Sequence, residues 1–121
     1  MAKIFPALLA LGLLSLPAAQ AAPASSKKPW GAIAYSSATG AFGYAVDRPS
    51  RRAAEAEAFR LCGADCDVIK TFRNACGAIA DGDRHFAWDT GGTREIAEMK
   101  ARKKCGGQSC RIAVWACAGG K

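Results

Sequence analysis

The hydrophobic pattern of the first half of the chain predicts two strands joined by a hairpin. Short apolar or aromatic runs occupy residues 32–35 and 41–46. Between them, residues 36–40 read Ser-Ser-Ala-Thr-Gly, a composition typical of a tight loop. A third run of this kind, at residues 68–72, predicts another strand further along the chain.

Between the second and third runs the pattern changes to the period of a helix. Ser50 is a good N-cap residue, and Ala54 and Ala58 recur behind it at helical spacing. Gly63, directly after Cys62, is expected to end this helix. Alanine at both inner positions would let the helix lie close to a sheet.

The second half of the chain repeats this order of elements. Gly31-Ala-Ile-Ala recurs as Gly77-Ala-Ile-Ala, and the offset between equivalent residues drifts only from 46 to 43 or 44. The expected elements are strands at 78–80, 86–88 and 111–115 and a helix at 93–104. Two copies of a strand-strand-helix-strand unit favour one pseudo-symmetric domain over an open solenoid, which needs three or more repeats.

The first 21 residues read as a secretory signal peptide. Lys3 supplies the positive start, residues 4–16 are mainly apolar, and Ala19-Gln20-Ala21 has the small-x-small form of a cleavage site. The apolar run is shorter than the ~20 residues of an ordinary spanning helix. We therefore expect a flexible leader at 22–29 and a single domain at 30–121, periplasmic or secreted, with no membrane span after cleavage.

The six cysteines fall in the predicted mature chain, and an even number in a short exported protein indicates disulfides. Symmetry-related cysteines should have the same kind of partner, which favours three pairs: Cys62–Cys66, Cys105–Cys110 and Cys76–Cys117. The last pair is expected to join equivalent ends of the two units and so to tie the halves together. The alternative is a four-cysteine zinc site from the Cys-x3-Cys and Cys-x4-Cys pairs. An oxidising compartment disfavours it, so we expect neither metal nor cofactor.

Together these features predict an α+β fold. It is a small disulfide-stabilised domain made of two pseudo-symmetric strand-strand-helix-strand units, with two helices packed on antiparallel sheet. A mature length near 100 residues supports only a modest core, and the disulfides compensate for part of that small size.

Several sequence blocks also resemble a known family. They are Trp-Gly-Ala-Ile-Ala-Tyr-Ser at 30–36, Gly-x-x-Gly-Tyr at 40–44, Arg-Leu-Cys-Gly at 60–63, Phe-Arg-Asn-Ala-Cys-Gly-Ala-Ile-Ala at 72–80 and Val-Trp-Ala-Cys at 114–117. In this order they resemble the bacterial family catalogued as domain of unknown function 4189, across residues 30–117. The resemblance implies a small exported domain and no activity, because the family has no established catalytic residues. One departure is the second hairpin, which reads Arg-His-Phe-Ala-Trp at 84–88 instead of a glycine- and tryptophan-rich stretch.

His85 is the one weak candidate for a catalytic residue. It is the only histidine, and Asp81, Asp83 and Asp89 are near it in sequence, so it could act as a general base in a small secreted hydrolase. It occupies the place of Ala41 in the first unit, however, and a strand would turn it away from the face of Phe86. No second histidine and no serine in a nucleophile-elbow setting accompanies it.

Charge gives a stronger indication of function. The chain has 17 Lys and Arg against 10 Asp and Glu, a net charge of +7, which favours anionic partners. Lysines at the end of the second helix complement its dipole, whereas arginines at the start of a helix do not. Arg48, Arg51 and Arg52 are therefore the more informative candidates for anion recognition.

Aromatic residues offer a second route to binding. Phe42, Phe86 and Trp115 are expected to fill the core. Trp30, Tyr44 and Trp88 are candidates for a binding surface, because tryptophan and tyrosine are common at the centres of interfaces.

The sequence therefore favours an exported, non-enzymatic binding domain of the bacterial envelope. Its expected partner is an envelope or extracellular protein or an anionic polymer, and the domain is expected to be a monomer. Nucleic acid is a poor target for an exported protein. Two alternatives stay open: a small secreted hydrolase using His85, and a secreted stress or virulence factor.

Overall fold

A computed structural model describes residues 27–121 of the chain. The predicted signal peptide and residues 22–26 of the predicted leader lie outside this range. The described part consists of six strands and two helices in two groups of the same order. The first group is β1 (Trp30–Tyr35), β2 (Phe42–Arg48), α1 (Arg51–Cys62) and β3 (Val68–Arg73), and the second is β4 (Cys76–Asp81), β5 (Phe86–Gly91), α2 (Arg94–Cys105) and β6 (Arg111–Cys117).

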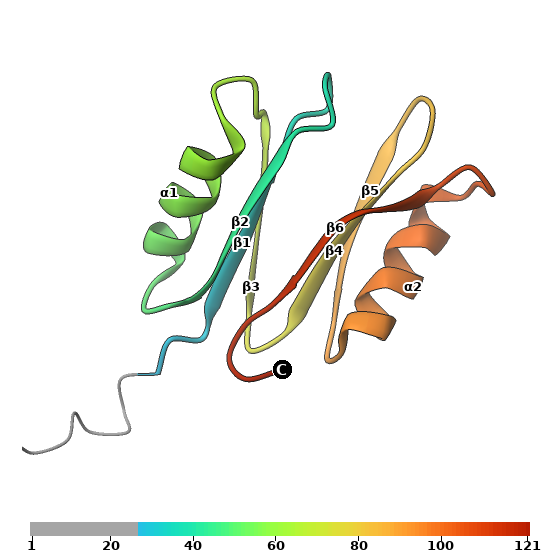
Figure 1. The fold of residues 1–121 in the computed structure, drawn as a ribbon. Helices are drawn as coiled ribbons and strands as arrows, with labels where there is room; N and C mark the ends of the chain where they lie inside the picture. Colours follow the sequence, from blue (N-terminus) through green and yellow to red (C-terminus); the bar gives the residue numbers. More distant parts are fainter. Residues whose placement is uncertain (1–26) are drawn as a thin grey trace, which may run out of the picture.

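Each group forms its own three-stranded antiparallel sheet. The strand order is β2-β1-β3 in the first sheet and β5-β4-β6 in the second. The two sheets face each other, and the helices cover their outer faces, so that the layers run α1, first sheet, second sheet, α2 (Figure 1). The α+β class and the two strand-strand-helix-strand units are as the sequence predicts.

On the central strands β1 and β4, small side chains face a helix and large side chains face the opposite sheet. On β1, Ala32 and Ala34 pack against α1, whereas Ile33 and Tyr35 point into the space between the sheets. On β4 the same alternation places Ala78 against α2 and Ile79 between the sheets. Larger side chains therefore form the core between the sheets, and alanines allow the helices to approach closely.

The helices begin and end at the residues that the pattern indicates. The side-chain oxygen of Ser50 accepts a hydrogen bond from the N–H of Ala53, and Thr93 caps α2 in the same way through the N–H of Ile96. Gly63 and Gly106 follow the last turns, and both have positive φ. The inner alanines, including Ala54 and Ala58, are fully buried.

Three disulfides link the six cysteines in the pairs that the repeat indicates: Cys62–Cys66, Cys105–Cys110 and Cys76–Cys117. The first two each close the corner after a helix. These four sulfurs therefore belong to two bridges on different helices, and they form no common zinc site.

The expectation that Cys76–Cys117 ties the two halves together is wrong. Cys76 begins β4 and Cys117 ends β6, and the two residues are direct partners within the second sheet. The corresponding pair in the first sheet is Trp30 and Arg73, whose guanidinium carbon lies 5.6 Å from the Trp30 ring centroid. A cation–π contact thus occupies the position that a disulfide occupies in the second sheet.

A polar contact does join the two sheets at one end. The hydroxyl of Tyr35, the last residue of β1, donates a hydrogen bond of 2.9 Å to Oδ2 of Asp81, the last residue of β4. Burial of the phenol, followed by this bond and the nearby carboxylates of Asp81 and Asp67, raises the pKa of Tyr35 from 10.0 to about 12.

This contact predicts a loss of stability in alkali. The folded protein holds the Tyr35 proton more tightly than the unfolded chain does, so the contribution is complete below pH 10 and is lost as the pH rises through about 12. We expect Tyr35→Phe to weaken the dependence of stability on pH above about pH 10, where an unperturbed tyrosine ionises. Guanidinium unfolding of both proteins near neutrality and at high pH tests this; equal pH dependence would contradict it.

Candidate functional site

The two edges where the sheets face each other differ in how well they are filled. On one edge, the closed side, β3 and β5 approach through Phe72 and Trp88, whose ring centroids are 6.0 Å apart. The Trp88 ring lies directly over Gly77, where a Cβ would come within 2.3 Å of it. The aromatic rings fill this edge.

The opposite edge, the open side, is formed by β2 and β6. In the strand register Tyr44 faces Ile33 as Trp88 faces Ile79, and Ala116 faces Gly77 as Phe72 faces Gly31. The open side therefore has Tyr44 and Ala116 where the closed side has Trp88 and Phe72. An alanine in place of a phenylalanine leaves space.

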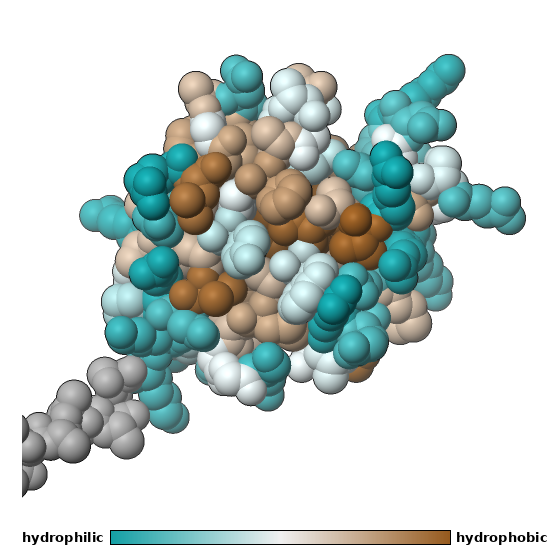
Figure 2. Space-filling model, in the orientation of Figure 1, coloured by the Kyte–Doolittle hydropathy of each residue, from teal (hydrophilic) through white to brown (hydrophobic). Residues whose placement is uncertain are grey.

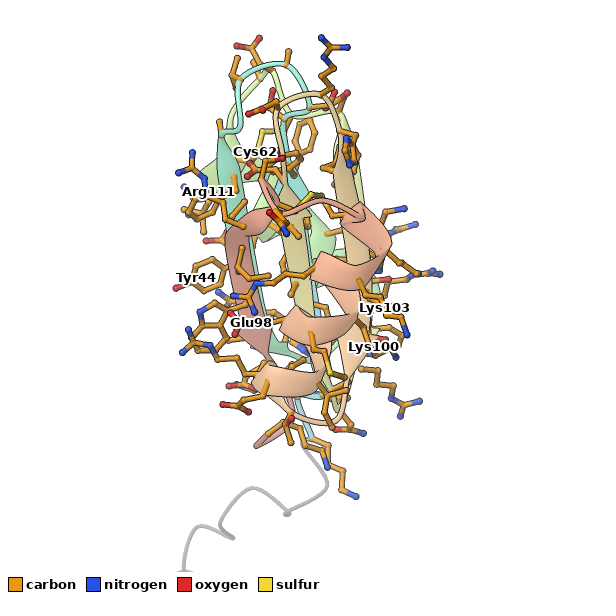
Figure 3. All side chains as sticks on the ribbon, turned by 90° about the vertical axis from the view of Figure 1, so that its right-hand side faces the viewer. Tyr44, Cys62, Glu98, Lys100, Lys103 and Arg111 are labelled. Atoms are coloured by element: carbon orange, nitrogen blue, oxygen red, sulfur yellow. A yellow bond between two sulfur atoms is a disulfide. The ribbon has the colours of Figure 1, made fainter. Side chains whose placement is uncertain are left out.

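That space is an open groove of about 510 Å³, which we call the aromatic groove. Figure 2 views this face: apolar side chains occupy its centre over β2 and β6, and most hydrophilic ones lie around its margin. Figure 3 shows Tyr44 pointing outward from this edge. The groove is lined by Phe42, Tyr44 and Val46 of β2, by residues 113–117 of β6, and by Lys121.

The groove exposes aromatic residues that the sequence assigns to the core. Phe42 is 45% exposed and Trp115 is 38% exposed, so the expectation that they fill the core is wrong. Both belong to edge strands, where the sandwich is too narrow to cover them. The guanidinium carbon of Arg94, on α2, lies 3.9 Å from the Trp115 ring centroid and covers one face of that ring.

The three aromatic binding candidates have different surroundings. Tyr44 is 47% exposed and lines the aromatic groove. Trp88 is half-buried on the closed side and packs against the core, and Phe86 packs there too, against Tyr35. Trp30 is half-buried at the start of β1 beside Arg73. Only Tyr44 of the three thus belongs to the groove.

The basic residues that the sequence singles out form two separate groups. Arg48 ends β2, whereas Arg51 and Arg52 begin α1, and all three are exposed. Nε of Arg51 pairs with Glu55 at 3.4 Å. The lysines at the end of the second helix lie on α2, which is separated from α1 by both sheets (Figure 1).

Two of the α2 lysines have a structural partner. Nζ of Lys100 and of Lys104 lies 3.5 Å and 3.2 Å, respectively, from a carboxylate oxygen of Asp89. Burial acts to raise the pKa of Asp89, but the N–H of Thr90 and the two ammonium groups outweigh it and lower that pKa. These lysines therefore neutralise a carboxylate on β5.

His85, the residue directly before β5, lies beside the C-terminal end of α2. Its Nε2 is within hydrogen-bond distance of the Cys105 carbonyl and 3.9 Å from Sγ of Cys110. The side chains of His85, Cys105 and Cys110 have their potential metal-ligand atoms within 4.8 Å of one another. The two sulfurs form a disulfide, however, and so offer no thiolate to a metal ion. With its tautomer bearing the proton on Nε2, His85 caps the carbonyl end of the helix.

This position predicts a structural effect of His85→Ala. We expect the free energy of unfolding to fall by about 1 kcal/mol, the net value of one hydrogen bond. Denaturant unfolding of this variant beside Arg84→Ala, a change at the exposed neighbouring residue, measures it. Equal stability of the two variants would show that the helix end does not depend on the imidazole.

Comparison with known proteins places the whole described fold in one family. The family described as Domain of unknown function (DUF4189) matches residues 30–117. The chain belongs to this family. The matched DUF4189 residues include all eight elements and all six cysteines, whereas Lys121 of the aromatic groove follows them.

Relatives of this DUF4189 chain occur in mycobacteria. Protein Rv1269c of Mycobacterium tuberculosis and Protein Mb1300c of Mycobacterium bovis are each 45% identical over 89 residues, which cover 73% of this chain and 68% of the relative. The NMR structure of Rv1813c from Mycobacterium tuberculosis is 36% identical, with a TM-score of 0.63 over 74% of this chain and 75% of that one.

The disulfides bear on where this DUF4189 domain folds. Three bridges in so short a chain are characteristic of proteins outside the reducing cytoplasm. Neither helix of residues 27–121 is long and apolar enough to cross a membrane.

Proposed function

We propose that this protein is an exported domain of the bacterial envelope, periplasmic or secreted, that acts by binding a protein or an anionic envelope component. The observation that carries the proposal is the aromatic groove. Phe42 and Tyr44 are each more than a third exposed on one edge of the sandwich, and Trp115 is exposed beside them on the face of β6 toward α2, although the opposite edge is filled. Exposed aromatic side chains gathered in a groove are typical of binding surfaces.

The surroundings of His85 favour binding over hydrolysis. Its Nε2 is engaged by the Cys105 carbonyl, and two of the three acidic residues near it in sequence, Asp81 and Asp89, have other partners. Asp89 pairs with lysines, and Asp81 accepts a hydrogen bond from Tyr35. Within residues 27–121 no cysteine is free to act as a nucleophile.

Capture from envelope extract tests this function. The oxidised domain, spanning residues 27–121, is immobilised and compared with Tyr44→Ala and with Phe59→Ala. Phe59 is an equally exposed aromatic residue, on α1, and it serves as the matched control. We expect Tyr44→Ala to reduce the captured ligand about tenfold, the effect of losing an interface side chain worth about 1.4 kcal/mol.

Mass spectrometry and lipid analysis of the captured material give the readout, at low and at high salt. A ligand that depends on Tyr44 but not on Phe59 supports a binding site in the groove. Material captured equally by all three proteins and released by salt would mean that only the net positive charge is being measured. That outcome would contradict the proposed function.

A further inference from the structure

We propose that the aromatic groove binds an acidic polypeptide segment in extended conformation, which adds to the free edge of β6 as a further strand. The proposal rests on the binding function above and names the class of partner. Four features of the open side support it: the backbone edge of β6, the apolar side chains of β2, the charge around the groove, and the barriers to self-association.

The first feature is the way in which β6 lines the groove. Five consecutive residues, 113–117, contribute to it. Side chains of a strand alternate between its two faces, so a consecutive run means that the edge of the strand, with its backbone, faces the groove. Among the strands of residues 27–121, β6 pairs only with β4, and its other edge has no strand partner there.

The strand register identifies a residue of β6 whose backbone can form hydrogen bonds with an added strand. Cys76 and Cys117 form a narrow pair, with a Cα–Cα distance of 3.9 Å, which is the kind that exchanges no backbone hydrogen bonds. Trp115 is two residues earlier and pairs with Ala78. The alternation of the ladder therefore turns the N–H and C=O of Trp115 away from β4 and toward the open edge.

The second feature is the wall opposite this edge. Phe42, Tyr44 and Val46 occupy every second position of β2, and their side chains face the groove. A strand added to β6 would place every second side chain against this apolar wall. Small or β-branched apolar residues at alternate positions fit this arrangement.

The third feature is charge. Lys121 lines the groove, and Arg111 begins β6 on the same side of the molecule as Tyr44 (Figure 3). Within residues 27–121 neither of these two basic side chains forms an ion pair, although Arg111 faces Asp81 in the strand register and lines a pocket with Asp81 and Asp83. The nearby Glu98 is paired with Arg94 at 3.4 Å. Available positive charge beside an apolar groove favours a segment with acidic residues.

Self-association is the competing use of a free edge, and two features oppose it. The register of β6 shifts between its contacts with Ile79 and Ala80, so that Ala113 bulges from the ladder. Positive charges on an edge strand keep copies of one chain apart, whereas the bulge limits strand addition by any partner to the part of β6 that follows Ala113. With a net charge of +7, two copies would also repel each other.

Binding of a defined peptide tests the proposal. The probe is an acetylated and amidated peptide of alternating valine and glutamate, about seven residues long to match β6. Two control peptides are used: one with lysine in place of glutamate, and one with the same acidic sequence but N-methylated backbone amides. Affinity is measured by fluorescence anisotropy, and exchange of the Trp115 amide proton is measured by NMR.

We expect the acidic peptide alone to bind and to slow exchange of the Trp115 amide. Phe42→Ala and Arg111→Glu should each weaken its binding about tenfold. The matched controls, Phe59→Ala and Arg102→Glu, change the same residue types at exposed helix positions and should have less than a twofold effect.

Four results would each overturn the proposal. They are no binding of the acidic peptide, equal binding of the lysine peptide, equal binding of the N-methylated peptide, and equal effects of the groove and helix variants. Protection of the Trp115 amide that rises with protein concentration in the absence of peptide would instead assign the edge to a second copy of the chain.

Failure of this proposal can be told apart from failure of the binding function. Envelope extract is treated with protease before the capture experiment. If Tyr44-dependent capture survives this treatment, the groove binds a glycan or lipid, so the binding function holds and the polypeptide partner is wrong. If capture never depends on Tyr44, the binding function itself is wrong.

Discussion

Replacing Cys76 and Cys117 together by alanine is expected to lower the free energy of unfolding by about 4 kcal/mol. The two residues are 41 positions apart, and in the chain-entropy model a loop of that size gives this stabilisation. The loss would be a large part of the total stability of a small domain, which is typically about 5–15 kcal/mol. Guanidinium unfolding without reductant gives the value.

The matched control is the short bridge between Cys62 and Cys66. These residues are only 4 positions apart, and the same model predicts a loss of about 2 kcal/mol when both become alanine. The long bridge should therefore matter about twice as much, even though it lies within a single sheet. An equal or larger loss from the short bridge would contradict the loop-entropy explanation.

Replacing Gly43 by alanine is expected to cost about 3 kcal/mol, at the upper end of the usual range for overpacking. A Cβ at this position would lie 2.4 Å from the backbone nitrogen of Cys62 and 2.5 Å from the carbonyl oxygen of Ala58. Both atoms belong to the backbone of α1, which cannot move aside as a flexible side chain would. The helix would have to shift away from β2.

Gly92→Ala provides the control for Gly43→Ala. A Cβ at Gly92 would meet nothing within 4 Å, and its φ is outside the region that favours glycine. The same substitution should therefore change the free energy of unfolding by less than about 1 kcal/mol. Thermal or denaturant unfolding of both variants decides the question. A small effect of Gly43→Ala would mean that α1 is less tightly held on β2 than the distances indicate.

The repeat explains why Gly43 differs from its counterpart. In the strand register Gly43 faces Ala34, and Ala87 on β5 faces Ala80 in the same way. The second unit therefore accommodates a methyl group where the first does not. The order of elements is shared by the two units, but the closeness of helix and sheet is set separately in each.

Much of the fold could be read from local patterns. The helix limits follow from Ser50 and Gly63, whose capping geometry depends on residues within one turn. The faces of β1 and β4 follow from the alternation of small and large side chains. The short disulfide pairs also follow, because their cysteines are close in sequence at the corner after a helix.

The candidate site could be predicted only in part. Tyr44 is an aromatic residue that the sequence offers for binding and that the structure places in the groove, whereas Phe42 and Trp115 were expected in the core. An aromatic residue in a strand pattern gives the same signal whether its strand is central or at an edge. The mismatch between Phe72 and Ala116 in the two copies was the available signal for an unfilled edge.

The sequence by itself determined the elements, their order, the two similar units and the residues that face the helices, because each depends on spacing along a short stretch of chain. Only the tertiary structure decided that the sheets face each other, that the Cys76–Cys117 bridge stays within one of them, and that β2 and β6 border an open groove. These outcomes depend on which strands lie at the edges and on what stands opposite them. Tyr44 and Ala116 are 72 positions apart, and no local pattern relates them.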